Sequence, residues 1–346
     1  MVKRSHLVPI VLAPLALLAG TVGAWLADAP HPLANLDDNF GQSLGPFGST
    51  VAAAWSLVAA GCFAVAAIAL TAPGGRPLHR QRRSVAIATA AVGLLMLDHT
   101  LLMLLGYLPM LLIRLLMGNT ELLPELVSPG LGMQVALAAG LIGLLLALRR
   151  ASTPATTTYD AKDLQRATEQ TRKWTLLAME APLVYALSRV LMFLQVPGFT
   201  SPDFSLGLRL AGLGLATASC LGVLLTWGLI RPWGERFPRW AVGLAGRRVP
   251  IDVAVIPALV VAALILAASR ALFLDAFTSG SDQWREQLEA PLIGLPQLLW
   301  PLWGVALAMA ALAYQRRRRA ADAVAAKAAG AGSADGYRRP HGQPAP

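Results

Sequence analysis

Ionisable residues inside long apolar stretches are the strongest candidates for chemistry in this sequence. Asp98 and His99 are adjacent in one such stretch, and Arg189 and Arg270 lie in two others. A charge near the centre of a bilayer costs ~2.5–3.5 kcal/mol even on the scale derived from translocon insertion, and such residues commonly mark pathways or binding sites. A carboxylate and a guanidinium can pair with each other or bind a polar ligand, and an imidazole can exchange a proton near neutral pH.

The rise of a helix predicts that three of these residues share one depth. If each stretch is a helix that starts at its basic end, Asp98, His99 and Arg189 lie roughly 21–23 Å along it, in the outer half of a membrane. Arg270 is expected farther out, near Asp275. One hypothesis is a polar ligand site that these four residues line and that opens to the outside. A second is an Asp98–Arg189 ion pair that only holds two helices together, and a third is a proton relay through His99. The sequence leaves all three open.

A second intramembrane polar site is predicted around Glu180. This residue lies roughly 9–10 Å from the basic end of its helix. Tyr185 follows five residues later and falls on another face of a helix. Glu180 would therefore bond a tyrosine or a backbone group across a helix interface.

Motifs of enzymes and metal sites are nearly absent. The segment Gly41–Gly45 fits G-x-S-x-G, but it lies in a loop, whereas a nucleophile elbow needs a strand before it and a helix after it. The sequence has no P-loop and no H-E-x-x-H. Cys62 and Cys220 do not form a metal or redox pair by spacing, and His99 is the only histidine deep in an apolar stretch. We predict no metal, no cofactor and no catalytic residue, so that an enzyme is the least favoured class.

The stretches that must position these residues predict an all-α membrane protein. Hydrophobic residues make up 55% of the chain and charged residues 14%, against roughly 25% charged residues in soluble domains. Each stretch is apolar on every face and long enough for the ~20 residues of a membrane span. The eight predicted transmembrane helices are Leu7–Ala27, Val51–Ala72, Ser84–Tyr107, Leu131–Leu148, Trp174–Leu194, Ser205–Ile230, Ile251–Leu274 and Leu292–Tyr314.

Charge is distributed as expected for a protein with both termini in the cytoplasm. Most of the 29 lysines and arginines fall before the first stretch, in every second loop, and after the last stretch. The other loops carry mainly aspartate and glutamate. This is the positive-inside pattern, and it explains the net charge of +10 without a nucleic-acid partner. The predicted partner is the lipid bilayer, with weak attraction of the basic loops to anionic lipid.

Landmarks in the two halves match in order and predict an internal repeat. Ala13-Pro14-Leu15 corresponds to Ala181-Pro182-Leu183, Cys62 to Cys220, and Arg82-Arg83 to Arg247-Arg248. Because each half has an even number of spans, the two four-helix repeats would be parallel rather than inverted. The predicted domains are a first membrane repeat (1–150), a cytoplasmic linker (151–173), a second membrane repeat (174–319) and a disordered cytoplasmic tail (320–346).

The loop between the sixth and seventh stretches carries a resemblance. Arg231-Pro232-Trp233-Gly234, Phe237-Pro238-Arg239-Trp240 and Gly246-Arg247-Arg248-Val249-Pro250 resemble a group of uncharacterised multi-pass membrane proteins of actinobacteria. The resemblance is strongest over the fifth to seventh stretches. It implies a location in the bacterial plasma membrane and contributes no catalytic residues.

Two functions fit these observations. The first is a transporter-like or small-ligand-binding membrane protein with an outer-half polar site between the repeats. The alternative is a non-catalytic membrane scaffold or sensor subunit that acts through a membrane protein partner. A hydrated cavity that reaches Asp98 and Arg189 would favour the first, and a dry bundle with an apolar lateral face would favour the second.

The charge pattern predicts the topology directly. Reporter fusions after Pro77, Thr157 and Arg319 should report a cytoplasmic location, and fusions near Asp37 and Asp282 an external one. An external signal from the fusion at Thr157 would contradict both the orientation and the parallel repeat.

Overall fold

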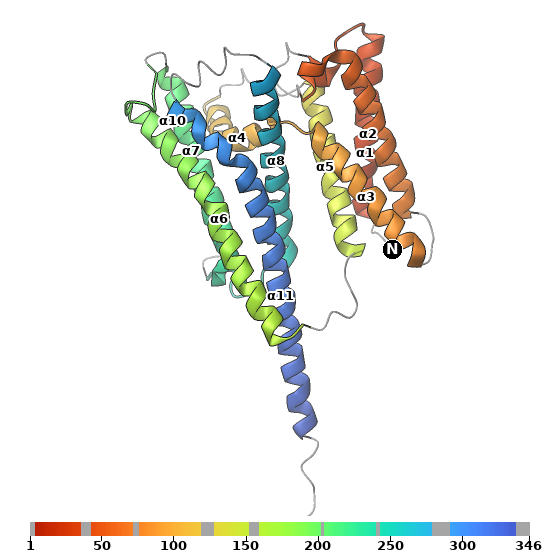
Figure 1. Ribbon diagram of the computed structural model, residues 1–346, viewed down its shortest axis with the longest axis vertical. Helices are drawn as coiled ribbons and strands as arrows, with labels where there is room; N and C mark the ends of the chain where they lie inside the picture. The colour runs from red at the N-terminus through yellow and green to blue at the C-terminus, as the bar shows by residue number, and fades with distance from the viewer. Residues whose placement is uncertain are drawn as a thin grey trace, which may run out of the picture.

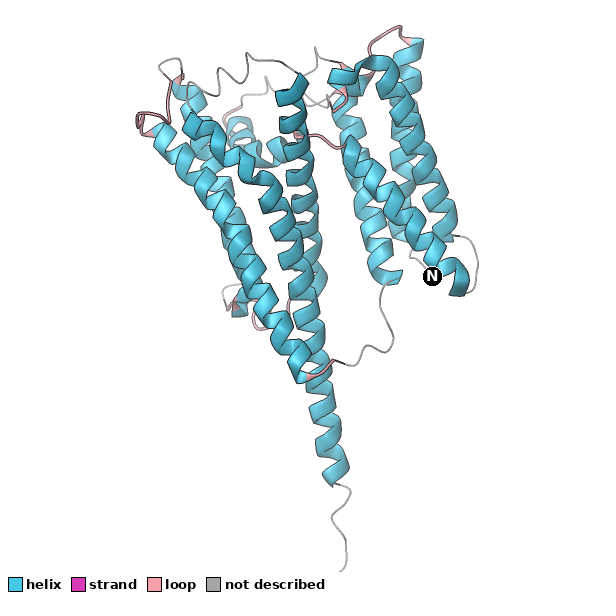
Figure 2. Cartoon of the chain, in the orientation of Figure 1, coloured by secondary structure: helices cyan, strands magenta, loops and turns pink. Residues whose placement is uncertain are grey.

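The computed structural model describes residues 4–35, 43–71, 76–118, 128–151, 159–201, 204–239, 243–278 and 291–336. Within these ranges the regular elements are helices (Figure 2), and the strand-like pairing is a single isolated bridge between Arg236 and Arg248. The helices form two groups that lie side by side (Figure 1). The all-α class predicted from the sequence is confirmed.

The first group contains α1 (Arg4–Leu26), α2 (Gly48–Thr71), α3 (Arg76–Met96) and α5 (Pro129–Ala151). Helix α1 packs against α2 and α5, and α3 packs against the same two helices. Leu17, Phe63 and Leu137 are fully buried in the core of this group. Close packing depends on Gly140, where an added Cβ would lie 2.6 Å from the Cβ of Ala13 and 2.8 Å from the ring of Phe63. Small residues at such contacts let helices approach closely in membranes.

The second group contains α6 (Ala161–Phe193), α7 (Leu206–Trp227), α8 (Ile251–Thr278) and α11 (Trp300–Gly336). Helix α11 packs along both α6 and α8, and α7 packs along α6. The short elements α10 (Pro291–Gly294) and η5 (Leu295–Leu299) lead into α11. The core is again built largely from small residues, among them Ala178, Ala262 and Ala306.

Helix α4 (Thr100–Leu116) links the two groups. It follows α3 in the chain but packs against α7 and α8 of the second group (Figure 1). An added Cβ at Gly106 would lie 2.7 Å from a methyl carbon of Leu215. The chain therefore crosses from one group to the other at the junction between α3 and α4.

The number of membrane spans can match the eight predicted from the sequence, but one of the predicted helices is interrupted. Seven described helices are long and apolar enough to cross a membrane, and the count reaches eight if the bent pair Gln81–Met96 and Thr100–Gly106 is one span. The two members of that pair meet at an angle of 70°. The protein is thus a multi-pass membrane protein, but the predicted continuous helix Ser84–Tyr107 is wrong, because the chain breaks at Leu97–His99.

Two predicted domain boundaries also need correction. The second part of the predicted linker 151–173 belongs to α6, which begins after Asp160 with reciprocal bonds between Asp160 and Asp163. The predicted disordered tail 320–346 is helical as far as Gly336, as the continuation of α11, and residues 337–346 lie outside the described ranges. Alanine, which dominates residues 320–329, has the highest helix propensity.

The neighbour relations of the two groups resemble each other. The contacts of α1 with α2 and α5 correspond to those of α6 with α7 and α11, and the contact of α3 with α5 to that of α8 with α11. The packing of α2 along α3 has no comparable counterpart between α7 and α8. The parallel repeat itself stays a prediction. Helix α1 begins at the end of the bundle where α11 ends (Figure 1), which we call the arginine end because Arg149, Arg248 and Arg316–Arg319 lie there. The opposite end is the far end.

At the far end, His31 fixes the connection between α1 and α2. Its side chain is 2% exposed. Nδ1 accepts a hydrogen bond from the backbone N–H of Leu33 at 3.2 Å, and Nε2 lies 3.0 Å from the hydroxyl of Thr21. Because that hydroxyl donates to the carbonyl of Leu17, this network assigns the proton to Nε2. Both ring nitrogens are thus used by a neutral imidazole, and burial lowers the pKa of His31.

This arrangement predicts a loss of stability in acid. Unfolded chains bind a proton at histidine near pH ~6.5, whereas His31 in the folded protein resists protonation. Stability should therefore fall as the pH drops below that value and reach its lower limit below the folded pKa. Between about pH 8 and about pH 5, which brackets the pKa of histidine in an unfolded chain, the melting temperature should fall less steeply for His31→Gln than for wild type. The exposed His99 supplies the control, and an equally flat profile for His99→Gln would contradict the assignment.

Candidate functional site

The break between α3 and α4 is centred on Asp98. Its side chain is 1% exposed. One carboxylate oxygen accepts a hydrogen bond from the backbone N–H of Thr100 at 2.9 Å, and the other accepts one from the hydroxyl of Thr100 at 2.9 Å. Aspartate is favoured before a helix because it satisfies backbone donors that have no partner inside the helix. The Asp98 carboxylate therefore satisfies the first backbone donor of α4, that of Thr100.

Side chains from both helix groups satisfy the backbone of the break. Gln134 on α5, fully buried, donates to the carbonyl of Met96 at 3.0 Å and accepts a long bond of 3.4 Å from the N–H of Asp98. Arg270 on α8 donates to the carbonyl of Leu97 at 2.7 Å. Each unsatisfied backbone group in hydrocarbon costs several kcal/mol. The two side chains therefore permit the break and tie it to both groups.

The predicted contact between Asp98 and Arg189 is wrong. No guanidinium nitrogen of Arg189 lies within 4.0 Å of a carboxylate oxygen of Asp98, and the ion pairs among the described residues lie elsewhere. Asp98 lies in the break between α3 and α4, whereas Arg189 lies on α6, which packs against α7 and α11. The arginine that reaches the break is Arg270. The sequence analysis included Arg270 among the four candidate site residues but did not predict this contact.

Arg189 is buried near the far end of α6, and its guanidinium has few hydrogen-bond acceptors. Its side chain is 8% exposed. The guanidinium carbon lies 4.7 Å from the centre of the Tyr185 ring, and one terminal nitrogen lies 3.7 Å from the sulfur of Met192, a weak acceptor. Its Nε is buried without a hydrogen-bond partner. Across the interface with α7, an added Cβ at Gly212 would lie 3.7 Å from the Cδ of Arg189.

Two further buried donors belong to the same region. Arg209 precedes Gly212 by three residues on α7 and so lies on the face of α7 that meets Arg189. The Nε of Arg209 and the indole N–H of Trp300 are buried without a partner. Trp300 packs on Tyr185 with 6.0 Å between ring centres. No described aspartate or glutamate pairs with Arg189 or Arg209. We call Tyr185, Arg189, Arg209 and Trp300 the far-end arginine cluster.

The remaining predicted site residues do not join these clusters. The side chain of His99 is exposed beside the break, so the structure does not bury it in a chain of proton carriers. Glu180 is exposed on α6, whereas Tyr185 is buried. The predicted second site of Glu180 and Tyr185 does not form, because Glu180 is exposed instead of lying in a helix interface. No described group of three or more His, Cys, Asp or Glu side chains could hold a metal ion.

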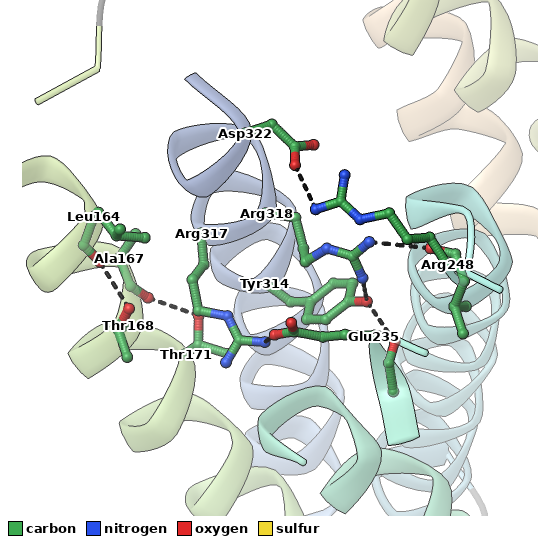
Figure 3. Close-up of polar contacts among 12 residues, drawn as sticks. Leu164, Ala167, Thr168, Thr171, Glu235, Arg248, Tyr314, Arg317, Arg318 and Asp322 are labelled. Carbon is green, nitrogen blue, oxygen red and sulfur yellow. Dashed lines mark hydrogen bonds and ion pairs between the residues drawn. The ribbon is translucent and has the colours of Figure 1, made fainter. Parts of the chain in front are cut away.

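Sequence reasoning missed a third polar cluster, at the arginine end (Figure 3). The hydroxyl of Tyr314 on α11 donates to the carbonyl of Gly234 at 2.8 Å and accepts from Arg318 at 2.6 Å. Arg318, 5% exposed, also donates to the carbonyl of Val249 at 3.1 Å. Two ion pairs flank these bonds, one between Arg317 and Glu235 and one between Arg248 and Asp322.

We call these contacts the α11 latch, because they hold the loop between α7 and α8 on α11. In the sequence analysis, Arg316–Arg319 served only as part of the positive-inside pattern. A usable signal was present in the spacing, because Tyr314, Arg318 and Asp322 recur every four residues and so share one face of a helix.

Comparisons of the chain with protein-family models, with characterised proteins and with solved structures found no match. The resemblance to the actinobacterial group stays a prediction, and the function must be argued from the geometry of the chain itself.

The geometry predicts which polar residues are energetically coupled. Asp98→Ala and Gln134→Leu should each lower the free energy of unfolding, and their effects should differ from additivity by about 0.5–3 kcal/mol because the two residues share one hydrogen-bond network. Asp98→Ala and Arg189→Gln should add to within about 0.5 kcal/mol, as expected for distant sites. Double-mutant cycles of reversible unfolding in detergent measure both terms. If the coupling energy of Asp98 with Arg189 exceeded that of Asp98 with Gln134, the result would support the Asp98–Arg189 ion pair and contradict the geometry described above.

Proposed function

We propose that the chain is a membrane protein that binds a small anionic ligand at the far-end arginine cluster, with Arg189 as the main positive charge. The observation that supports this most directly is a buried arginine that pairs with no acidic residue in the described part of the chain. Buried charges are normally paired or neutralised, because removing them from water costs several kcal/mol per ion. An arginine cannot deprotonate to avoid that cost.

The chemistry of the cluster favours a carboxylate or a phosphate group. The planar guanidinium presents its donors as a fork that matches the two oxygens of such groups. Stacking on Tyr185 at 4.7 Å fixes the plane of this fork through a cation–π contact. Arg209 supplies a second positive charge and Trp300 a third buried donor. All of these groups donate, so an acceptor-rich ligand suits them.

A transporter-like mechanism is the extension of this proposal. Interrupted helices are a recurrent feature of secondary transporters, and the break at Asp98 is placed where the chain passes from one helix group to the other. The cluster lies within the second group, and α4, which follows the break, packs against α7 beside it. The parallel repeat, the plasma-membrane location and the cytoplasmic termini belong to the same proposal.

One observation favours the alternative of a membrane scaffold. The polar atoms of the break bond to Thr100, Gln134 and Arg270, and Asp98 and Gln134 are almost fully buried. A dry junction of this kind needs no ligand. The two functions differ in what they require of Arg189. A ligand-binding protein would lose its ligand response when Arg189 is replaced by a neutral residue, whereas a scaffold has no such response to lose.

Thermal stabilisation by anions tests the proposal. The purified protein in detergent is titrated with acetate, succinate and inorganic phosphate at constant ionic strength. At a ligand concentration of 100 times Kd, binding to the folded state should add about 2.7 kcal/mol of stability. Arg189→Gln should abolish the response, whereas Arg231→Gln, an exposed arginine at the other end, should retain it. Equal responses of the two variants, or no response of the wild type to any of the three anions, would contradict the proposal.

A further inference from the structure

We propose that the loop between α7 and α8 is a binding surface for anionic lipid headgroups, formed by Arg231, Arg236, Arg239 and Arg247. This surface lies at the arginine end and does not depend on the ligand proposed for Arg189. Its partner is the leaflet that surrounds this end of the bundle.

Backbone hydrogen bonds join the two described arms of the loop. Glu235 and Phe237 pair with the other arm of the loop, where the N–H of Val249 donates to the carbonyl of Glu235 at 2.8 Å and the N–H of Phe237 donates to the carbonyl of Arg247 at 3.0 Å. The α11 latch then ties both arms to α11, through Gly234 on one side and Val249 on the other (Figure 3). A charged surface on this loop therefore loses little conformational freedom when it binds.

The charges of the loop divide into two sets. Arg248 pairs with Asp322, and Glu235, the acidic residue of the described part of the loop, pairs with Arg317. The four other arginines of the described loop are exposed and form no ion pair with a described acid. The α11 latch thus pairs Glu235 and Asp322 with arginines. The four other arginines of the described loop remain as an excess of exposed positive charge.

The position of Arg231 places this surplus at the edge of the apolar surface. Cys220, Leu221, Leu224 and Leu225 form an exposed stripe on α7, and Trp227 continues that stripe, since it follows Cys220 by two helical turns. The guanidinium of Arg231 lies over the ring of Trp227, 4.2 Å from its centre. Indole rings favour the membrane–water interface, so the stacked arginine lies at the level of the lipid phosphates.

Anionic lipid is the partner that this geometry fits best. Clusters of arginine beside membrane helices attract acidic headgroups, and the attraction decays within a Debye length of the surface. Four arginines on the hydrogen-bonded arms of the loop, at the phosphate level, meet both conditions. A nucleic acid would meet the same charges, but it would have to approach the level at which the apolar stripe of α7 ends.

The test compares two variants that each lose four positive charges. The first replaces Arg231, Arg236, Arg239 and Arg247 by glutamine. The control replaces Lys162, Arg166, Arg172 and Lys173, which are exposed on α6. Each full-length protein is placed in nanodiscs of phosphatidylcholine alone or of phosphatidylcholine with phosphatidylglycerol, and bound phosphatidylglycerol is counted by native mass spectrometry after release.

We expect wild type and the α6 control to retain phosphatidylglycerol and to melt at a higher temperature in the acidic nanodiscs. The loop variant should lose both effects, with at least about a tenfold drop in retention, or roughly 1.4 kcal/mol. Its unchanged melting temperature in phosphatidylcholine would show that it folds. Equal losses in the two variants would show diffuse charge attraction and overturn the proposal. The proposal would also be overturned if a duplex oligonucleotide displaced the lipid from wild type and bound the loop variant only weakly.

Discussion

The structure depends on how a few residues of non-helical backbone are satisfied inside an apolar bundle. A bilayer offers no water to the carbonyls of Met96 and Leu97, so a break there survives only if other side chains bond to them. Gln134 and Arg270 supply those bonds. Because the break exists, α4 can leave the direction of α3 and pack against α7 and α8. The association of the two helix groups therefore rests in part on two hydrogen bonds to backbone oxygen.

The same principle separates structural arginines from candidate functional ones. Arg270, Arg317 and Arg318 bond to backbone carbonyls, a hydroxyl or a carboxylate of the protein. Arg189 and Arg209 form no side-chain hydrogen bond to a described oxygen atom, and the Nε of each is buried without a partner. Exposed arginines such as Arg231 form a third class, which water and lipid headgroups can satisfy. The first class explains the fold, whereas the second and third carry the two proposals for binding.

The sequence predicted the class of the protein and the positions of its helices, because apolar length is a local property. It could not predict the break, since Leu97-Asp98-His99-Thr100 contains no glycine or proline and the residue that bonds Met96 lies 38 positions away in the chain. It placed Asp98 and Arg189 at one depth, but depth is a single coordinate and says nothing about which helices are neighbours. The face of Glu180 and the latch at Tyr314 were accessible in principle from helical periodicity. The continuation of α11 beyond Ala320 was also signalled, by its alanine content.

The central claim is that anions reach Arg189 while the break at Asp98 stays dry. The most direct measurement is the rate of cysteine modification in a background in which Cys62 and Cys220 are replaced by alanine. Met192→Cys places a thiol beside the guanidinium of Arg189, and Thr100→Cys places one in the break. The account predicts that a negatively charged methanethiosulfonate reagent modifies Cys at position 192 faster than a positively charged one, that Arg189→Gln removes this preference, and that position 100 reacts with neither. A position 192 that reacts with neither reagent, or that shows the same preference without Arg189, would contradict it.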